Sequence, residues 1–190
     1  AAERNKSPIG HLLQKSFSGL DSVLEIGSGS GQHAQFFAAK LPHLMWQPTE
    51  RSENLDSISE YVREARLPNL NEPLELDVAD PPNELLERVQ LPYFDGVFTA
   101  NTMHIMSSLE VRKFFSYLST MLSPEFVVCI YGPFCFHGQF TAQSNENFDA
   151  SLRTRNSQQG IRDAYWLKSL VDQYLGVHVM EIHNMPANNH

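Results

Sequence analysis

The sequence predicts an α/β fold in which helices cover both faces of a mostly parallel sheet. Short apolar runs typical of strands alternate with longer stretches of helical periodicity. A glycine-rich turn follows the first apolar run and opens a helix. The chain has 190 residues, 42% of them hydrophobic, which is enough for one substantial core. We therefore expect a single domain over residues 1–190.

The first strand, turn and helix carry the strongest local signal. A helix-like segment over 8–17 precedes an apolar strand over 23–26, and the turn contains Gly27, Gly29 and Gly31. Glycines permit a tight turn and a close approach of the backbone to a ligand, and the free amides of the next helix are hydrogen-bond donors. That helix carries an apolar stripe at Ala34, Phe37, Ala38 and Leu41, and Pro42 ends it. The turn predicts a site for a nucleotide-like ligand.

The rest of the chain continues the alternation of strands and helices. We expect strands over 44–46, 73–78, 94–99 and 126–131, helices over 55–65, 85–89, 107–118 and 167–174, and a last strand over 177–182. Ser107 and Glu110 form a capping box, which marks a helix start. The strand over 126–131 is uniformly apolar, so it is predicted to be central and fully buried.

Residues 133–162 interrupt the alternation as an insertion. They contain many Asn, Gln, Ser and Arg residues and few positions with helical apolar periodicity. Loops of this length usually carry function or are disordered, and the aromatic and charged content argues against disorder. We expect a structured active-site cover with a short helix near 147–152.

Charge and composition exclude several classes of protein. A formal net charge of −8 argues against a nucleic-acid partner. Arg153, Arg155 and Arg162 form either a local basic patch or surface pairs with nearby acids. The chain as given shows no membrane-spanning run and no signal leader, so a cytoplasmic location and no membrane partner are expected. The histidines and cysteines lack metal-ligand spacing, so no metal is expected, and Cys129 and Cys135 are predicted to be buried thiols rather than a disulfide.

The spacing of the glycines narrows the choice of ligand. A dinucleotide-binding turn has the pattern G-x-G-x-x-G, whereas this chain has G-x-G-x-G after the strand acid Glu25. Glu50 follows about twenty residues after the glycines, where an acid can bind ribose hydroxyls. No lysine stands at the spacing of a nucleotide triphosphatase loop.

This pattern resembles the first motif of class I S-adenosylmethionine-dependent methyltransferases. Over its whole length the chain also resembles a small methyltransferase-like family of unassigned biochemical role. The matching segments are 1–6, 25–33, 46–48, 131–134, 143–145, 148–149, 152–153, 155–156, 160–163 and 185–189. The resemblance implies a Rossmann-like sheet of order 3-2-1-4-5-7-6, with strand 7 missing from the chain that stops at His190. The family often has Asp where this chain has Glu50, a longer carboxylate that still reaches a ribose.

The resemblance implies a cofactor site for S-adenosylmethionine. Gly27, Gly29 and Gly31 would surround the amino-acid portion of the cofactor, and Glu50 would hold its ribose hydroxyls. Glu25 would belong to the same cofactor-binding site. Asp77 would contact the adenine amine, with a local turn cap as the alternative role. Asn101 and Met103 would line the methionine side, and ordinary loop positions are the alternative for both.

The sequence indicates less clearly which residues take part in the reaction and which bind the acceptor, the molecule that receives the methyl group. His104 is the candidate general base, against a structural hydrogen-bonded role, and Tyr131 either orients the acceptor or packs in the core. The polar cluster of residues 4–6, which are Arg4, Asn5 and Lys6, would close the site, with a solvated charge run as the alternative. The insertion would face the acceptor with Asn145, Asp149, Arg153 and Arg155, and its arginines suit a carboxylate or phosphate.

The predicted function is S-adenosylmethionine-dependent methyl transfer to a small-molecule acceptor, with S-adenosylhomocysteine as product. The segment Asn101-Thr102-Met103-His104 lacks the Asn-Pro-Pro-Tyr pattern associated with amide or exocyclic nitrogen acceptors, which favours a metabolite. Two alternatives stay open: a non-catalytic module that binds S-adenosylmethionine or a protein partner, and an NAD-type oxidoreductase.

Overall fold

The computed structural model describes residues 2–82, 84–176 and 179–190, and it contains two compact units. Unit 1 comprises Ala1–Thr99 and Met121–Ile130, and unit 2 comprises Ala100–Thr120 and Tyr131–His190. The chain passes between the units at the ends of strands and helices rather than through a separate linker. A single domain over residues 1–190 stays a prediction.

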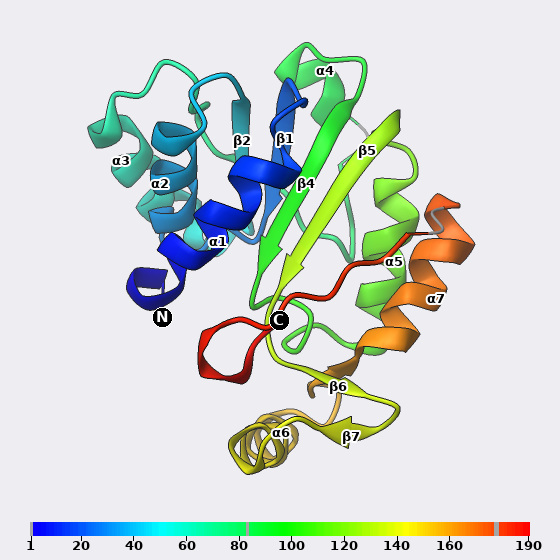
Figure 1. Ribbon diagram of the computed structural model, residues 1–190. Coiled ribbons are helices and arrows are strands. Elements are labelled where there is room, and N and C mark those ends of the chain that lie inside the picture. The colour runs from blue at the N-terminus through cyan, green and yellow to red at the C-terminus, as the bar shows by residue number, and fades with distance from the viewer. Residues whose placement is uncertain (1, 83, 177–178) are drawn as a thin grey trace. The chain divides into compact units, whose positions relative to one another are not determined.

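Unit 1 is built on a five-stranded sheet of order β3-β2-β1-β4-β5. The strands are β1 (Ser22–Ile26), β2 (Met45–Glu50), β3 (Leu74–Glu75), β4 (Phe94–Ala100) and β5 (Leu122–Tyr131). β1 pairs in parallel with both β2 and β4, and β2 pairs in parallel with β3. The arrows of β4 and β5 also run the same way in Figure 1. The structure confirms the predicted α/β class and its mostly parallel sheet, with the expected order 3-2-1-4-5 in this part.

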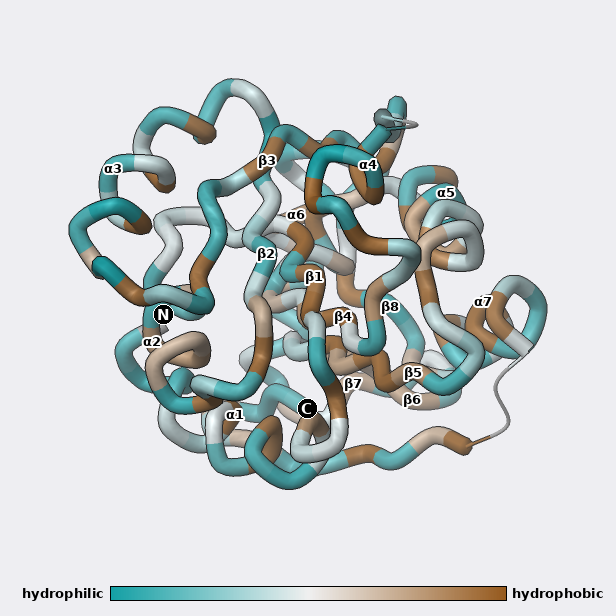
Figure 2. The backbone as a smooth tube through the Cα atoms, turned by 90° about the horizontal axis from the view of Figure 1, so that it is seen from above, coloured by the Kyte–Doolittle hydropathy of each residue, from teal (hydrophilic) through white to brown (hydrophobic). Residues whose placement is uncertain are grey.

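The helices of unit 1 pack against one another and against this sheet. They are α1 (Ala2–Ser16), α2 (Gln32–Lys40), α3 (Leu55–Ala65) and the short α4 (Leu85–Val89), with a 3-10 turn η1 (Ser52–Asn54) before α3. α2 packs between α1 and α3, and both α2 and α3 contact β2 (Figure 1). All five residues of β1 are buried, and the tube of this strand includes hydrophobic residues, drawn brown in Figure 2. Complete burial explains why this strand reads as an apolar run without alternation.

The first helix begins six residues earlier than the sequence predicts. The proline rule places a helix start at Pro8, but α1 begins at Ala2 and carries Pro8 inside it. Asn5, Ile9 and Leu13 are buried at intervals of four, so one buried stripe runs through the proline. Burial of that stripe compensates for the hydrogen bond that proline cannot donate.

Two strand predictions are corrected. β5 is longer than predicted and lies at the edge of the sheet in the part of the chain that the structure describes, and residues 126–130 are only half-buried. Its apolar run indicated a strand correctly but not a central position. The strand predicted over 73–78 shortens to Leu74–Glu75, because only Thr49 and Glu50 of β2 pair with it.

Unit 2 combines three helices with a small three-stranded sheet. The helices are α5 (Ser108–Leu118), α6 (Gln143–Arg155) and α7 (Ala164–Leu175), and the sheet has the order β7-β6-β8. Its strands are β6 (Phe134–Phe136), β7 (Gln139–Phe140) and β8 (Arg162–Asp163), and α5 packs against α7. The predicted capping box of α5 is confirmed, because Ser107 Oγ accepts from the Glu110 amide and the Glu110 carboxylate accepts from the Ser107 amide.

The insertion over 133–162 is ordered and more regular than expected. Its helix, α6, has 13 residues and extends well beyond the predicted 147–152. The last predicted strand, over 177–182, is wrong at its described positions. Residues 179–182 form no ladder, and Val179 is 77% exposed; residues 177 and 178 lie outside the described residues. A short 3-10 turn, η2 (Pro186–Asn188), follows. No described helix has the length and apolarity needed to span a membrane.

Candidate functional site

The glycine turn of unit 1 has the geometry that its sequence predicts. Gly27, Gly29 and Gly31 have φ angles of 72°, 57° and 80°, in the left-handed region that favours glycine. The carbonyl of Thr49 at the end of β2 accepts the amides of Gly27 and Ser28 at 3.1 and 3.0 Å. The turn is therefore fixed to the neighbouring strand rather than free to move.

Glu50 lies directly on this turn. Its Oε2 accepts the Gly29 amide at 2.6 Å, and its Oε1 accepts the Arg51 amide at 2.9 Å and the Asn54 side-chain amide at 3.4 Å. The residue is buried. The structure thus brings together the glycines and the acid that the sequence separates by about twenty positions.

The turn leaves room and donors for a ligand. A Cβ added to Gly29 would find no atom within 4 Å, although a Cβ on Gly31 would lie 3.1 Å from Ile58. No side chain caps the start of α2, so its first amides lack the usual side-chain acceptor. These features fit the polar groups of a nucleoside-containing cofactor.

Glu25 lies behind the turn and bonds to the core. Its Oε2 accepts the indole N–H of Trp46 at 2.7 Å, and it is 2% exposed. Burial raises the pKa of Glu25 to about 7, because hydrogen bonds from Trp46 and Ser28 offset the desolvation of the carboxylate only in part. The charge of Glu50 contributes to the same upward shift.

Asp77 has mainly local contacts. Its Oδ1 accepts the Ala79 amide at 2.8 Å, and its Oδ2 lies 3.6 Å from Nε of Arg51, the residue after Glu50. The local turn cap, which was one of the two roles expected from the sequence, is therefore present. The partly exposed carboxylate keeps further acceptor capacity.

The three polar residues at the start of α1 have three different environments. Asn5 is buried, and its Oδ1 lies 2.9 Å from Nε2 of His33 on α2. Lys6 binds Glu3 at 2.6 Å and stands over the Phe36 ring, whereas Arg4 is exposed. Asn5 is thus an anchor between two helices.

His33 is a site residue that the sequence did not single out. Its ring stacks on Phe37 at 5.3 Å and meets Phe98 edge-on. Burial, together with the nearby Lys6 cation, lowers its pKa to about 4. The sequence signal that could have identified His33 is its position directly after the glycine turn.

In unit 2, three predicted residues meet where β4 and β5 end. The Asn101 amide donates to the Tyr131 carbonyl at 2.8 Å, and Asn101 has a φ of 60°. A Cβ on Gly132 would lie 3.9 Å from both Asn101 Oδ1 and His104 Nδ1. Tyr131 and Met103 are both buried. The turn after β4 therefore places polar atoms of Asn101 and His104 on one side of Gly132.

His104 is buried and neutral near neutral pH. Its ring meets Phe148 of α6 edge-on at 5.2 Å, and its carbonyl accepts the Gly160 amide at 2.9 Å. Burial, together with the nearby cations Arg162 and Arg155, lowers the pKa of His104 to about 4. Its hydrogen-bonded main chain matches the structural alternative, and its neutral ring keeps one acceptor nitrogen.

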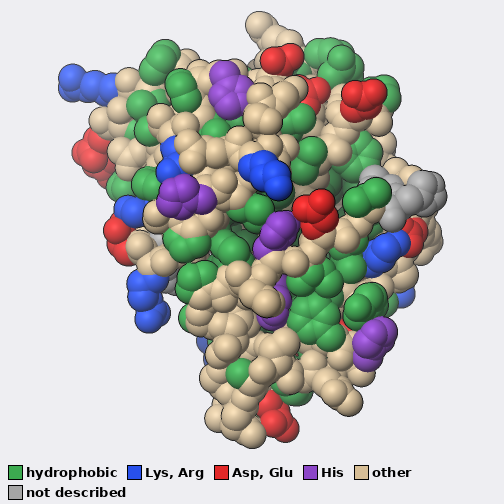
Figure 3. Space-filling view, viewed as in Figure 1, with side chains coloured by type: hydrophobic (Ala, Val, Ile, Leu, Met, Phe, Trp, Pro, Cys, Tyr) green, Lys and Arg blue, Asp and Glu red, His purple; other side chains and the backbone are tan. Residues whose placement is uncertain are grey.

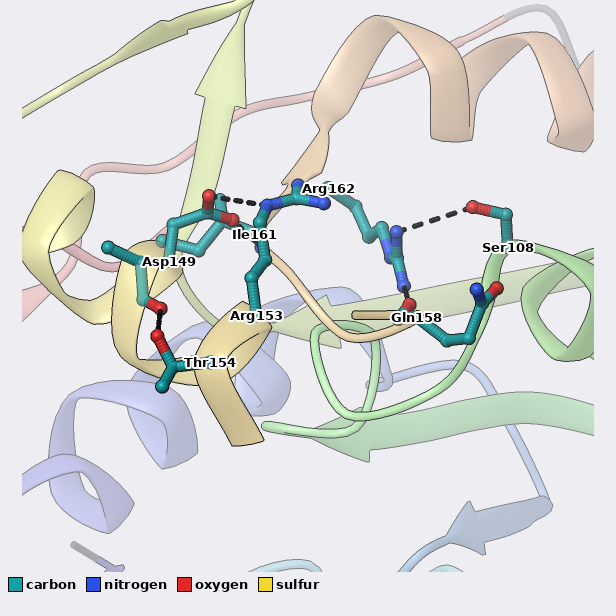
Figure 4. Close-up of polar contacts among 8 residues, drawn as sticks. Ser108, Asp149, Arg153, Thr154, Gln158, Ile161 and Arg162 are labelled. Atoms are coloured by element: carbon teal, nitrogen blue, oxygen red, sulfur yellow. Dashed lines mark hydrogen bonds and ion pairs between the residues drawn. The ribbon is translucent and has the colours of Figure 1, made fainter. Parts of the chain in front are cut away.

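The residues predicted to face the methyl acceptor lie on α6, where three of them share a face. Asn145, Asp149 and Arg153 follow one another at intervals of four. Nδ2 of the Asn145 side chain donates to the Asn188 carbonyl at 3.0 Å. Asp149 accepts Nε of Arg153 and the Ile161 amide, both at 2.7 Å (Figure 4). Arg153 and Arg155 are both exposed, but Arg153 is paired with Asp149, whereas Arg155 donates to the Ser151 carbonyl of its own helix, at 3.4 Å.

Arg162 does not belong to a surface patch. It is 8% exposed, and its guanidinium donates to the Gln158 carbonyl at 2.7 Å and to Ser108 Oγ at 3.3 Å (Figure 4). It also donates to the Met103 carbonyl at 3.2 Å and to the Met106 carbonyl. The prediction of surface arginines was wrong for this residue. A sequence cannot distinguish a buried arginine from an exposed one when its acceptors are backbone carbonyls.

The surface and the thiols add little to the site. In Figure 3, basic and acidic side chains are interspersed over the visible face. Cys129 and Cys135 are free thiols, as predicted. Among residues 2–82, 84–176 and 179–190, no three His, Cys, Asp or Glu side chains form a group that could hold a metal.

Solved structures with a similar fold are methyltransferases. An O-methyltransferase family 2 protein from Planctomyces limnophilus, in complex with apigenin, matches with a TM-score of 0.80 at 12% identity over 97% of this chain and 54% of that one. An O-methyltransferase family protein from Burkholderia thailandensis gives 0.77 at 15% identity over 94% and 52%. Human N-acetylserotonin methyltransferase, in complex with S-adenosylmethionine, gives 0.74 at 12% identity over 95% and 49%.

The chain spans about half the length of these structures. At such low identities the likeness establishes the fold, and this chain has the Rossmann-like fold of these methyltransferases. The family model described as "Protein of unknown function (DUF938)" matches residues 1–190, and the chain therefore belongs to that family.

Proposed function

We propose that this chain binds S-adenosylmethionine and transfers its methyl group to a small-molecule acceptor, leaving S-adenosylhomocysteine. The observation that carries the proposal is the Glu50 carboxylate bound to the Gly29 amide, on a left-handed glycine turn that opens α2. A turn amide and an acid at the end of the next strand suit a nucleoside with a ribose diol. The similar fold of methyltransferases, one of them solved with S-adenosylmethionine, supports the same choice.

Each cofactor-binding residue has a proposed part. Gly27, Gly29 and Gly31 pass close to the amino-acid portion, and Glu50 accepts hydrogen bonds from the ribose hydroxyls with lone pairs that the turn amides leave free. Glu25 supports the strand end from behind through Trp46. Asp77 contacts the adenine amine, and Asn101 and Met103 line the methionine side.

The residues proposed for the chemistry are His104 and Tyr131. S-adenosylmethionine, when bound, supplies a methyl group activated on a sulfonium. The neutral His104 ring offers a nitrogen that accepts a hydrogen bond from the acceptor and orients it. With a pKa of about 4 the ring is a weak base, so it suits an acceptor whose proton is already acidic. Tyr131, buried beside Asn101, orients the same region.

The proposed acceptor is a small molecule met by the insertion. Arg155 is exposed, so it is available to an acidic group, whereas Arg153 already binds Asp149. Asn145 and Asp149 shape the face of α6. On unit 1, Arg4, Asn5 and Lys6 of α1 close the cofactor site at the glycine turn. The Planctomyces limnophilus structure, which is a complex with apigenin, is one case in which this fold holds a small organic molecule.

The test is calorimetric titration of the chain with S-adenosylmethionine, S-adenosylhomocysteine and NAD. We expect selective binding of the first two and at least a tenfold loss of affinity in Glu50→Ala. Glu53→Ala is the matched control, because Glu53 is an exposed acid three residues away that contacts Arg51.

The outcomes separate the alternatives. Binding of NAD alone would replace the proposal with an oxidoreductase. Binding of S-adenosylmethionine without formation of S-adenosylhomocysteine, across a screen of acidic small molecules, would indicate a non-catalytic module. A folded chain that binds neither sulfur compound would refute the cofactor assignment.

A further inference from the structure

Arg162 is the buried cation that joins two segments of unit 2. Its guanidinium donates to the carbonyls of Met103 and Met106 and to the hydroxyl of Ser108 on one side, and to the Gln158 carbonyl on the other. Segment 103–108 contains His104, and segment 158–162 follows α6. A single planar side chain therefore connects the turn after β4 to the end of the insertion.

Neighbouring main-chain contacts reinforce this connection. The Gly160 amide donates to the His104 carbonyl at 2.9 Å, so the backbone of His104 itself is held by the segment that carries Arg162. The Ile161 amide donates to Asp149, which also binds Arg153. Segment 158–162 is thus fixed to α6 at one point and to the His104 backbone at another.

The choice of an arginine has a physical reason. Burying a cation is unfavourable unless its donors are satisfied, and here neutral oxygens from two segments satisfy them. Arginine presents its donors in a rigid planar fork, so one residue can hold carbonyls that point from different directions. Lysine carries the same charge without that fork.

We propose that Arg162 is a positioning residue for His104: it fixes segment 103–108 against segment 158–162, so that the His104 ring stays beside Gly132 and Phe148. The effect on methyl transfer rests on the proposed function, but the positioning does not. The ring has two defined neighbours, because Phe148 is 5.2 Å from it and Nδ1 lies 3.9 Å from the place of a Cβ on Gly132.

Arg162 also acts on His104 through its charge. The charged groups that influence the ring are Arg162 and Arg155, and both oppose its protonation. Loss of Arg162 therefore has two effects, release of the segment and removal of a cation. Substitution by lysine keeps the charge but removes the planar set of guanidinium donors, whereas substitution by methionine removes both.

The experiment uses the full chain and two readouts that need no substrate. Nuclear magnetic resonance follows the titration of the His104 ring, and hydrogen exchange follows the Gly160 amide in wild type, Arg162→Lys and Arg162→Met. We expect exchange of the Gly160 amide to accelerate at least tenfold in both variants. The His104 pKa should rise toward its ordinary value of 6.5, and it should rise more in Arg162→Met.

Two controls keep the test specific. His33, buried in unit 1 with a pKa of about 4, should titrate as in wild type in every folded variant. Arg155→Met removes the other cation without removing a partner of segment 103–108, so it should raise the His104 pKa and leave Gly160 exchange unchanged. If Arg162→Met does not fold, Ser108→Ala deletes one acceptor and should accelerate Gly160 exchange by a smaller factor.

Unchanged Gly160 exchange in the folded Arg162 variants would overturn the proposal, whatever the His104 pKa. Where methyl transfer is measured, the acidic limb of the kcat profile should move with the His104 pKa in Arg162→Met. Absence of S-adenosylmethionine binding would refute the proposed function and leave the positioning role standing, so the two failures are distinguishable.

Discussion

At the scale of single residues, the most informative positions are buried ionisable groups whose pKa values are shifted. Glu25 and His104 are both buried, and burial moves both pKa values toward the neutral form, upward for the acid and downward for the base. Such shifts concentrate at functional sites, although structural networks produce them as well. Their consequence for stability follows from proton linkage.

Glu25→Gln should remove a pH-dependent loss of stability. In the folded chain Glu25 keeps its proton up to a pH of about 7, whereas in the unfolded chain it loses the proton near 4.5. The native state binds more protons between these values, so wild-type stability falls as pH rises through this window, by about 3 kcal/mol in total. Glutamine is neutral throughout and still accepts from Trp46.

Urea unfolding at pH 4.5 and pH 8 measures this effect. The advantage of Glu25→Gln over wild type should be small at pH 4.5 and about 3 kcal/mol at pH 8. Glu64→Gln, at an exposed position of α3, is the control and should show no such trend. A constant difference between Glu25→Gln and wild type at both pH values would contradict the assignment.

Gly160→Ala should disturb the insertion. Gly160 has a φ of 153°, and an added Cβ would lie 2.5 Å from Arg153 Nη2 and 2.9 Å from Asp149 Oδ1. We expect a loss of roughly 1–3 kcal/mol, from backbone strain and from displacement of Arg153 away from Asp149. Thermal unfolding measures it, with Gly19→Ala as control, because nothing lies within 4 Å of a Cβ there.

A double variant separates the two causes. Arg153→Ala removes the side chain that an alanine at 160 would strike. If the steric contact matters, the Gly160→Ala penalty should be smaller in the Arg153→Ala background than in wild type. Equal penalties in both backgrounds would assign the whole effect to backbone strain or to Asp149.

At the scale of elements, periodicity located the helices and strands but not all of their ends. The capping box placed the start of α5 correctly, because the signal is a local exchange of hydrogen bonds. Pro8 misplaced the start of α1, because the buried stripe of Asn5, Ile9 and Leu13 depends on packing against α2. The run over 126–131 identified β5 correctly, but its position at the sheet edge depends on neighbouring strands.

Asn5→Ala tests the docking of α1. The change deletes the hydrogen bond between Asn5 Oδ1 and His33 Nε2 and leaves that buried nitrogen without its side-chain partner. We expect a loss of about 1–3 kcal/mol in urea unfolding. Arg4→Ala is the matched control, one position earlier on the exposed face, and should change stability by about 0.5 kcal/mol or less. Equal effects of the two substitutions would refute the anchor role.

At the scale of the whole molecule, the chain crosses between the two units within a continuous strand at two of its three crossings. β4 begins in unit 1 and ends at Ala100 of unit 2, and β5 ends at Tyr131 of unit 2. Elements shared in this way favour a single cooperative transition, in keeping with the single domain predicted for residues 1–190.

Native-state hydrogen exchange tests this prediction. The slowest amides of β1, in unit 1, and of α5, in unit 2, should give the same free energy of opening, equal to the global value. Mass spectrometry of the two peptides at increasing urea concentration provides the measurement. Clearly different opening free energies for β1 and α5 would mean that the units unfold separately.

The sequence by itself determined the α/β class, the glycine turn, the pairing of that turn with Glu50 and the start of α5. These features depend on neighbours in the chain or on a strand-turn-helix pattern whose geometry is nearly fixed. The tertiary structure alone decided that Arg162 is buried, that Asn5 anchors α1 on His33, that Arg153 is engaged by Asp149 and that residues 179–182 form no strand. Each of these depends on partners distant in the chain or on helix packing, and burial and pairing are properties of the folded arrangement rather than of local composition.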